Sequence, residues 1–139
     1  MNRTRLARRR GFQCLHRYQV EDWPAEKNRE IFGACFTPGG HGHNYSLEVY
    51  LEGVPDPVTG MILNLADLDR VLADVLSAVE GKRLHDEVPQ LQGRVPTTEN
   101  LAEFLFAQLQ SRCGRLAEGV RLVKIRLYEY EDLWVDVWA

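Results

Sequence analysis

The chain has 139 residues, 45% of them hydrophobic and 27% charged, with a formal net charge of −3. This size and composition exclude two large domains and a disordered chain, so we expect one folded domain over residues 1–139. The longest apolar helical stretch, residues 65–79, is interrupted by charged side chains, which excludes a membrane span of about 20 residues.

The N-terminal segment is basic, with five arginines among its first ten residues. Clustered guanidinium groups could neutralise nucleic-acid phosphates, but arginines on the exposed positions of a strand over residues 8–18 are the simpler explanation. The sequence has no basic groove interleaved with aromatic residues, so we expect no nucleic-acid partner. No apolar segment or cleavage site for secretion follows the arginines, and we therefore expect a cytoplasmic protein without a membrane partner.

The middle of the chain predicts a strand followed by a helix. Residues 45–52 alternate between apolar and polar side chains, as in a strand with one buried face. A turn rich in proline, aspartate and glycine follows over residues 54–60. Apolar side chains then recur every three or four positions over residues 65–79, which predicts an amphipathic helix that Asn64 caps and Gly81 ends.

The C-terminal part predicts a second helix and two strands. The helix begins at a threonine cap near Pro96 and ends at Cys113-Gly114, and residues 123–128 and 133–138 alternate as strands. The order strand, strand, helix, helix, strand, strand predicts an α+β domain in which two helices cover one face of a four-stranded antiparallel sheet. Because an open sheet leaves unpaired edges, we also expect the subunits to assemble.

Histidines form the densest group of chemistry-bearing residues. In an extended segment, His41 and His43 project from the same side of the chain, at a separation that one cation can bridge. His16, near the end of the first predicted strand, is placed to supply a third imidazole. Three neutral imidazoles around zinc leave a fourth position open, which is typical of a catalytic site. The alternative is that the three histidines share no ligand.

Cys35 and Glu129 are further candidate site residues. A divalent cation near Cys35 would favour its thiolate and make it a base or a nucleophile, whereas a small buried apolar residue is the alternative. Glu129 continues the apolar face of its strand, where a carboxylate would accept two parallel hydrogen bonds from a pterin or guanine edge, or else pair with an arginine. The three cysteines are an odd number without close spacing, which argues against a disulfide framework.

These segments together resemble the 6-pyruvoyltetrahydropterin synthase and 6-carboxytetrahydropterin synthase family over nearly the whole chain. The matching pieces are residues 12–17, residues 32–45 with their spacing from Cys35 to His41, residues 56–68, residues 96–100 and the pair Tyr128-Glu129. The spacing from the cysteine to the histidines, together with the segment around Asn64, is more similar to the pyruvoyl branch than to the carboxy branch.

The resemblance implies a T-fold subunit whose trimers close a barrel, with two trimers stacked into a homohexamer and pockets between subunits. It also implies a small-molecule pterin substrate, 7,8-dihydroneopterin triphosphate in the family. The implied site residues are His16, His41 and His43 for zinc, Cys35 as the catalytic thiol, Glu129 as the pterin anchor, and Thr97, Thr98 and Glu99 as a second pterin-contacting segment. From the sequence alone, the last three are explained by helix capping.

One segment departs from the family pattern. Where the family has an adjacent aspartate and histidine, this chain has Glu80-Gly81, so Glu80 remains as a catalytic candidate and the proton-transferring imidazole is missing. Loss of such a group commonly costs about 10²- to 10⁴-fold in rate. His85 could replace it, although a shift of four residues would usually orient the ring elsewhere and leave an exposed surface histidine.

We therefore expect a zinc-dependent, lyase-like enzyme acting on 7,8-dihydroneopterin triphosphate or a related reduced pterin, by triphosphate elimination or side-chain cleavage. The alternative is a catalytically impaired pterin-binding or regulatory homologue. The retained Cys35 and the three histidines favour the enzyme, and Gly81 favours the binder.

Overall fold

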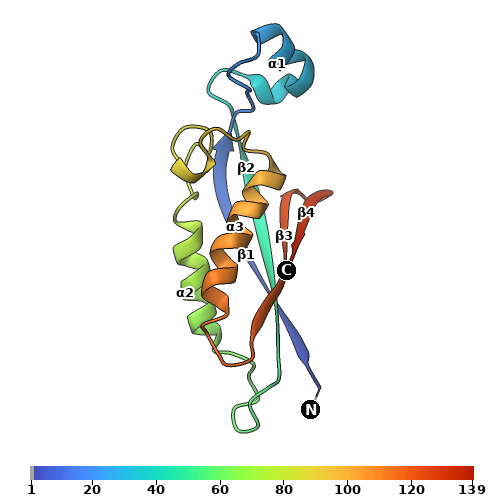
Figure 1. Cartoon of the computed structure of the whole chain (residues 1–139), viewed down its shortest axis with the longest axis vertical. Coiled ribbons are helices and arrows are strands. Elements are labelled where there is room, and N and C mark those ends of the chain that lie inside the picture. The colour runs from blue at the N-terminus through green and yellow to red at the C-terminus, as the bar shows by residue number, and fades with distance from the viewer. Residues whose placement is uncertain (1) are drawn as a thin grey trace.

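The computed structural model describes residues 2–139 and contains one antiparallel sheet with the strand order β1-β2-β3-β4 (Figure 1). The elements are β1 (Thr4–His16), α1 (Ala25–Phe32), a 3-10 helix (Gly33–Phe36), β2 (His41–Gly53), α2 (Leu65–Leu76), a 3-10 helix (Pro89–Leu91), α3 (Thr98–Cys113), β3 (Arg121–Tyr130) and β4 (Leu133–Trp138). Within residues 2–139, no helix is both long and apolar enough to cross a membrane.

The α2 and α3 helices pack side by side on one face of the sheet, which confirms the predicted α+β architecture (Figure 1). Alternation along the strands explains this arrangement, because every second residue of β2 from Tyr45 to Leu51 is buried toward the helices. The helices bury their own apolar stripes against the same core, including Leu72 of α2 and Leu105 of α3.

The predicted helix caps are present, but α2 is shorter than expected. Asn64 accepts a hydrogen bond from the backbone of Ala66 at 2.9 Å, and Thr97 accepts one from the backbone of Asn100 at 3.1 Å. The α2 helix ends at Leu76 instead of continuing to Gly81. Turns follow, and they still bury Val79, which explains why the apolar period continues past the end of the helix.

Four of the five N-terminal arginines belong to β1, which begins at Thr4 and pairs with β2 along its whole length. Arg5 pairs with Glu52 at 2.6 Å and Arg9 with Glu48 at 3.3 Å, both across neighbouring strands. Arg8, on the helix-covered face, forms two hydrogen bonds to Asp69 of α2. Arginines of the basic segment therefore pair with acidic side chains of the same chain.

The structure adds helix α1, which lies at one end of the molecule beyond the sheet (Figure 1). This helix was not predicted because its eight residues are mostly polar, and its one buried side chain is that of Asn28. The Asn28 carboxamide accepts a hydrogen bond from the Val20 backbone and donates to the carbonyls of Val20 and Trp23. A buried amide therefore fastens α1 to the loop that precedes it.

Residues 81–84 run along the outer edge of β1. The Gly81 backbone donates to Gln13 at 2.7 Å, Leu15 donates to Lys82 at 2.9 Å, and Leu84 donates to Leu15 at 2.8 Å. This segment places the residues that follow it next to the end of β1, where His16 lies.

Candidate functional site

Three imidazoles converge where β1 ends and β2 begins. His16 is paired directly opposite His41, and His43 follows two residues later on the same side of β2. The Nε2 atom of His16 lies 3.0 Å from that of His41 and 3.2 Å from that of His43. Their ligand atoms all lie within 4.8 Å of one another, so the three histidines could hold a metal ion.

The environment keeps two of these imidazoles neutral. Burial lowers the pKa of His16 to about 3, with further contributions from its neighbours His43 and His41. Burial also lowers the pKa of His43. Because a metal binds the unprotonated nitrogen, this chemistry fits a metal ligand set.

Tyr45 orients the first of the three rings. Its hydroxyl lies 2.9 Å from Nδ1 of His16, and both side chains are buried. In the tautomer with the proton on Nδ1, His16 donates to this hydroxyl and keeps the lone pair of Nε2 for a metal. The alternation that places His43 on the inner face of β2 also places Tyr45 there, so the position of Tyr45 beside the histidines was predictable from the sequence.

Gly40 allows the two strand ends to approach closely. Its φ is +74°, and a Cβ added there would lie 2.2 Å from the carbonyl oxygen of His16. Only glycine fits this contact, since a side chain would force β1 and the start of β2 apart.

Cys35 lies beside the histidines, half-buried in the 3-10 helix that follows α1. Its sulfur is 4.0 Å from Nε2 of His41, and its carbonyl accepts a hydrogen bond from the Tyr18 backbone at 2.8 Å. Burial raises the pKa of the thiol, and Glu129 raises it further. The protein's own groups therefore favour the protonated thiol.

Glu129 lies near the end of β3, where the pairing with β4 is irregular between Tyr128 and Tyr130. Its side chain is 10% exposed, with Oε1 at 3.3 Å from Nε2 of His43. Thr98 donates a hydrogen bond to Oε2. Within the part of the chain that the structure describes, Glu129 pairs with no arginine.

The three residues at the start of α3 have different contacts. Thr97 caps the helix, Thr98 turns inward to Glu129, and Glu99 is exposed in the first turn. The structure therefore brings together the three histidines, Cys35, Glu129 and Thr98 within one subunit.

The segment with the family departure lies next to this group. Glu80 and Gly81 are exposed in the turn after α2, and Gly81 has a φ of +72° with open space where a Cβ would be. His85 is not an exposed surface histidine, because its side chain is 19% exposed and its buried Nδ1 has no hydrogen-bond partner among residues 2–139. It lies close enough to His16 to contribute to lowering the pKa of that ring.

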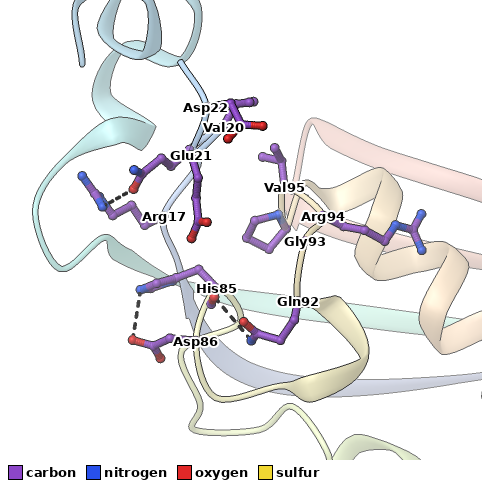
Figure 2. Close-up of a pocket in the computed structure, with 12 residues that line it drawn as sticks. Arg17, Val20, Glu21, Asp22, His85, Asp86, Gln92, Gly93, Arg94 and Val95 are labelled. Atoms are coloured by element: carbon purple, nitrogen blue, oxygen red, sulfur yellow. Dashed lines mark hydrogen bonds and ion pairs between the residues drawn. The ribbon is translucent and has the colours of Figure 1, made fainter. Parts of the chain in front are cut away.

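His85 lines a pocket of about 560 Å³ (Figure 2). Figure 2 shows His85 and Gln92 on one side of this pocket and Arg17 and Glu21 on the other. The three clustered histidines and Cys35 are not among the residues that line it. The pocket adjoins the end of β1, because Arg17, the residue after His16, lines it together with His85.

Comparison with known proteins gives one family. A family profile described as 6-pyruvoyl tetrahydropterin synthase matches residues 5–139. The 6-pyruvoyl tetrahydrobiopterin synthase of Homo sapiens is 37% identical over 130 residues, which cover 93% of this chain and 87% of the human protein. The dihydroneopterin monophosphate aldolase of Pyrococcus furiosus is 24% identical over 135 residues, which cover 97% of each chain.

A solved structure shows the same similarity in three dimensions. The 6-pyruvoyl tetrahydropterin synthase of Caenorhabditis elegans superimposes with a TM-score of 0.91 at 31% identity. The match covers 100% of this chain and 97% of that one.

Proposed function

The chain belongs to the 6-pyruvoyl tetrahydropterin synthase family, and on this premise we propose that it is a zinc-dependent lyase acting on 7,8-dihydroneopterin triphosphate or a related reduced pterin. The observation that carries the proposal is the convergence of three histidines, a thiol and a buried carboxylate in one place. A site that only bound a pterin would need the carboxylate but would have no use for a thiol beside a metal.

In this proposal His16, His41 and His43 hold the zinc ion. Bound zinc would act as a Lewis acid on the side-chain oxygens of the pterin. Tyr45 keeps the His16 ring turned so that Nε2 faces the site.

Glu129 recognises the pterin ring. Its carboxylate is buried beside the histidines, and the 2-amino-4-oxo edge of a pterin offers two adjacent N–H donors. Thr98 fixes the carboxylate through Oε2. This contact orients Glu129 before a ligand arrives, which lowers the entropy lost on binding.

Cys35 moves a proton at the side chain of the pterin. In triphosphate elimination, a base removes a proton from the carbon next to the one that carries the triphosphate. The C–H electron pair forms a carbon–carbon double bond, and the C–O bond breaks as the triphosphate leaves with its electron pair. The sulfur lies 4.0 Å from His41 Nε2, so the thiol is next to a residue that would hold the metal. Because burial and Glu129 raise the pKa of the free thiol, loss of its proton would depend on the bound cation.

Glu80 and His85 are the remaining catalytic candidates. Glu80 is exposed at the turn and would need a neighbouring subunit or a movement to approach Cys35. His85 is better placed to replace the missing imidazole, because it is mostly buried near His16 and its Nδ1 is free of partners within residues 2–139. Thr97 and Glu99 complete the proposed pterin-contacting segment.

The second candidate function is a pterin-binding protein without turnover. Gly81 favours it, since this position lacks the proton-transferring imidazole of the family. Such a protein would retain the Glu129 and Thr98 contacts and lose catalysis alone.

The wider setting of the enzyme is also a proposal. We infer that residues 1–139 act as one domain in a cytoplasmic homohexamer of two trimers, with pterin as the small-molecule partner. The unpaired edge of β4, with the exposed Trp134 and Trp138, supports assembly through the sheet. A monomeric mass by light scattering at micromolar concentration would contradict this part of the proposal.

Product analysis separates the two functions. Zinc-loaded protein and its Cys35→Ala variant are incubated with 7,8-dihydroneopterin triphosphate, and the products are identified by mass spectrometry. Release of triphosphate or of a side-chain fragment by the unmodified protein alone would establish an enzyme and its type of reaction. Unchanged substrate that is nevertheless bound would favour the binder, and absence of binding would contradict both functions. Cys113→Ala, which removes a thiol in the core, is the matched control.

A further inference from the structure

Tyr130 has no role in the function proposed above, yet its ring lies against a residue of the histidine cluster. The centroids of the Tyr130 and His43 rings are 5.0 Å apart, and the two rings meet edge to face at 88°. This contact uses only part of the tyrosine, because 54% of the residue is exposed. A large aromatic surface is therefore open directly beside a proposed metal ligand.

An irregularity in β3 explains how Tyr130 reaches this position. Tyr128 is opposite Trp134 of β4, and Tyr130 is opposite Leu133. Between these two pairs β3 has one residue more than β4, namely Glu129. In a regular strand, Glu129 and Tyr130 would project from opposite faces of the sheet. An extra residue of this kind is a β-bulge, which redirects the side chains next to it.

The bulge turns two consecutive side chains toward one histidine. Oε1 of Glu129 lies 3.3 Å from Nε2 of His43, and the Tyr130 ring packs on the same imidazole. Tyr128, on the other side of Glu129 in the chain, lies on the opposite face of the sheet, where the guanidinium of Arg9 is 5.2 Å from the centre of its ring. A carboxylate and an aromatic ring are thus presented together at the histidine cluster.

The two side chains suit different parts of a flat ligand. A carboxylate holds one edge of a ligand through two adjacent N–H donors, and these parallel hydrogen bonds set the plane of the ligand. An aromatic side chain instead packs against a second ring, with little regard to the polar groups on the held edge. A ligand that is anchored at Glu129 and extends toward the metal passes His43, and it therefore reaches the ring that packs on this histidine.

We propose that Tyr130 is a specificity-determining residue, which contacts the second ring of the bicyclic ligand that Glu129 anchors. The inference rests on the proposed function, since it takes a pterin as the ligand of Glu129. It divides recognition between two consecutive residues, because Glu129 selects the N–H edge and Tyr130 selects a bicyclic over a monocyclic ligand. A ligand with the same edge on a single ring keeps the first contact and lacks the second.

The experiment compares 6-methylpterin, which has two rings, with isocytosine, which carries the same N–H edge on one ring. Dissociation constants are measured by fluorescence titration for 6-methylpterin and by its displacement for isocytosine. Tyr130→Leu removes the aromatic ring, Tyr130→Phe retains it, and Glu129→Gln alters the anchor. Tyr128→Leu is the matched control, because it removes the neighbouring aromatic ring on the opposite face of the sheet. Zinc content, thermal unfolding and mass by light scattering are recorded for each variant.

We expect Tyr130→Leu to weaken 6-methylpterin binding about tenfold, the size of one aromatic contact and the ring surface that it buries. Isocytosine binding should change much less, so the preference for the bicyclic ligand falls by a similar factor. Tyr130→Phe should bind both ligands nearly as the unmodified protein does, because it keeps the ring. Glu129→Gln should weaken both ligands by similar factors, since they share the anchored edge. Tyr128→Leu should leave both affinities unchanged.

Four results would overturn the inference while the proposed function stands. The first is an unchanged 6-methylpterin affinity in Tyr130→Leu, and the second is an equal loss for both ligands, which would indicate damage to the anchor. The third is the same loss in Tyr128→Leu, which would indicate a general effect on β3. The fourth is a smaller molecular mass of Tyr130→Leu, which would assign the ring to a contact between subunits. If the unmodified protein binds neither ligand, the proposed function itself is wrong and the inference is rejected with it.

Discussion

Replacement of Gly40 by alanine tests the geometry of the histidine cluster. The added Cβ would lie 2.2 Å from the carbonyl oxygen of His16 and 2.8 Å from its carbonyl carbon. Since non-bonded carbon atoms pack at roughly 3.5 Å, the two backbones must separate by about 1 Å. His41 is the next residue, so the displacement acts directly on the distance between its ring and that of His16.

The expected effect on metal binding follows from how little the distances between zinc and its ligands can vary in such sites. Zinc–nitrogen distances vary by only about 0.2 Å, so a displacement of about 1 Å removes one ligand from the set. We expect Gly40→Ala to lower zinc affinity by about 100-fold or more, measured by competition with a chromophoric chelator. Urea unfolding in the presence of a chelator should also show a loss of stability from the clash.

Gly39→Ala is the matched control. Gly39 has a φ of +77°, close to that of Gly40, but a Cβ there would meet nothing within 4 Å. Both variants therefore share the cost of a left-handed alanine, about 1–2 kcal/mol, and only Gly40→Ala adds the collision. Equal zinc affinity in the two variants would refute the inferred role of the close approach.

Three further substitutions test separate contacts. Tyr45→Phe removes the hydroxyl beside Nδ1 of His16 and should lower zinc affinity about 10- to 100-fold in the same competition assay, while unchanged affinity would contradict the orienting role. Asn28→Ala removes the buried carboxamide that fastens α1 and should cost about 2–3 kcal/mol in urea unfolding, with faster reaction of Cys35 toward thiol reagents; a slower reaction would count against that role. Hydrogen bonds from its arginine neighbour on β3 lower the pKa of Asp136, so this group stabilises the fold above about pH 4 and loses that effect as the pH falls through its folded pKa. Asp136→Asn should therefore be about 1 kcal/mol less stable at pH 7, with the difference narrowing toward pH 2, whereas a pH-independent difference would contradict this reasoning.

Much of the fold could be predicted because local patterns and the final packing agree. The helix after Asn64 and the strand from Tyr45 follow their apolar periods and caps. Helix α1 could not be found in this way, since its single buried residue is the polar Asn28, which stabilises a loop instead of the core. The early end of α2 could not be predicted from the apolar period either, because Val79 is still buried after the helix has ended.

The candidate site was predictable where it depends on strand alternation. His41 and His43 share a face because β2 is extended, and the pairing with β1 brings His16 opposite. The place of His85 was not predictable, because it depends on hydrogen bonds between residues 81–84 and the edge of β1.

The same hydrogen bonds along the edge of β1 limit how another chain can join the sheet. The outward backbone groups of Gln13 and Leu15 are already used by residues 81–84, whereas within residues 2–139 those from Arg5 to Gly11 have no backbone partner. At the β1 edge, a neighbouring strand can therefore extend the sheet only along the N-terminal part of β1. Residues 81–84 therefore keep a strand added at this edge away from the end of β1, where His16 lies.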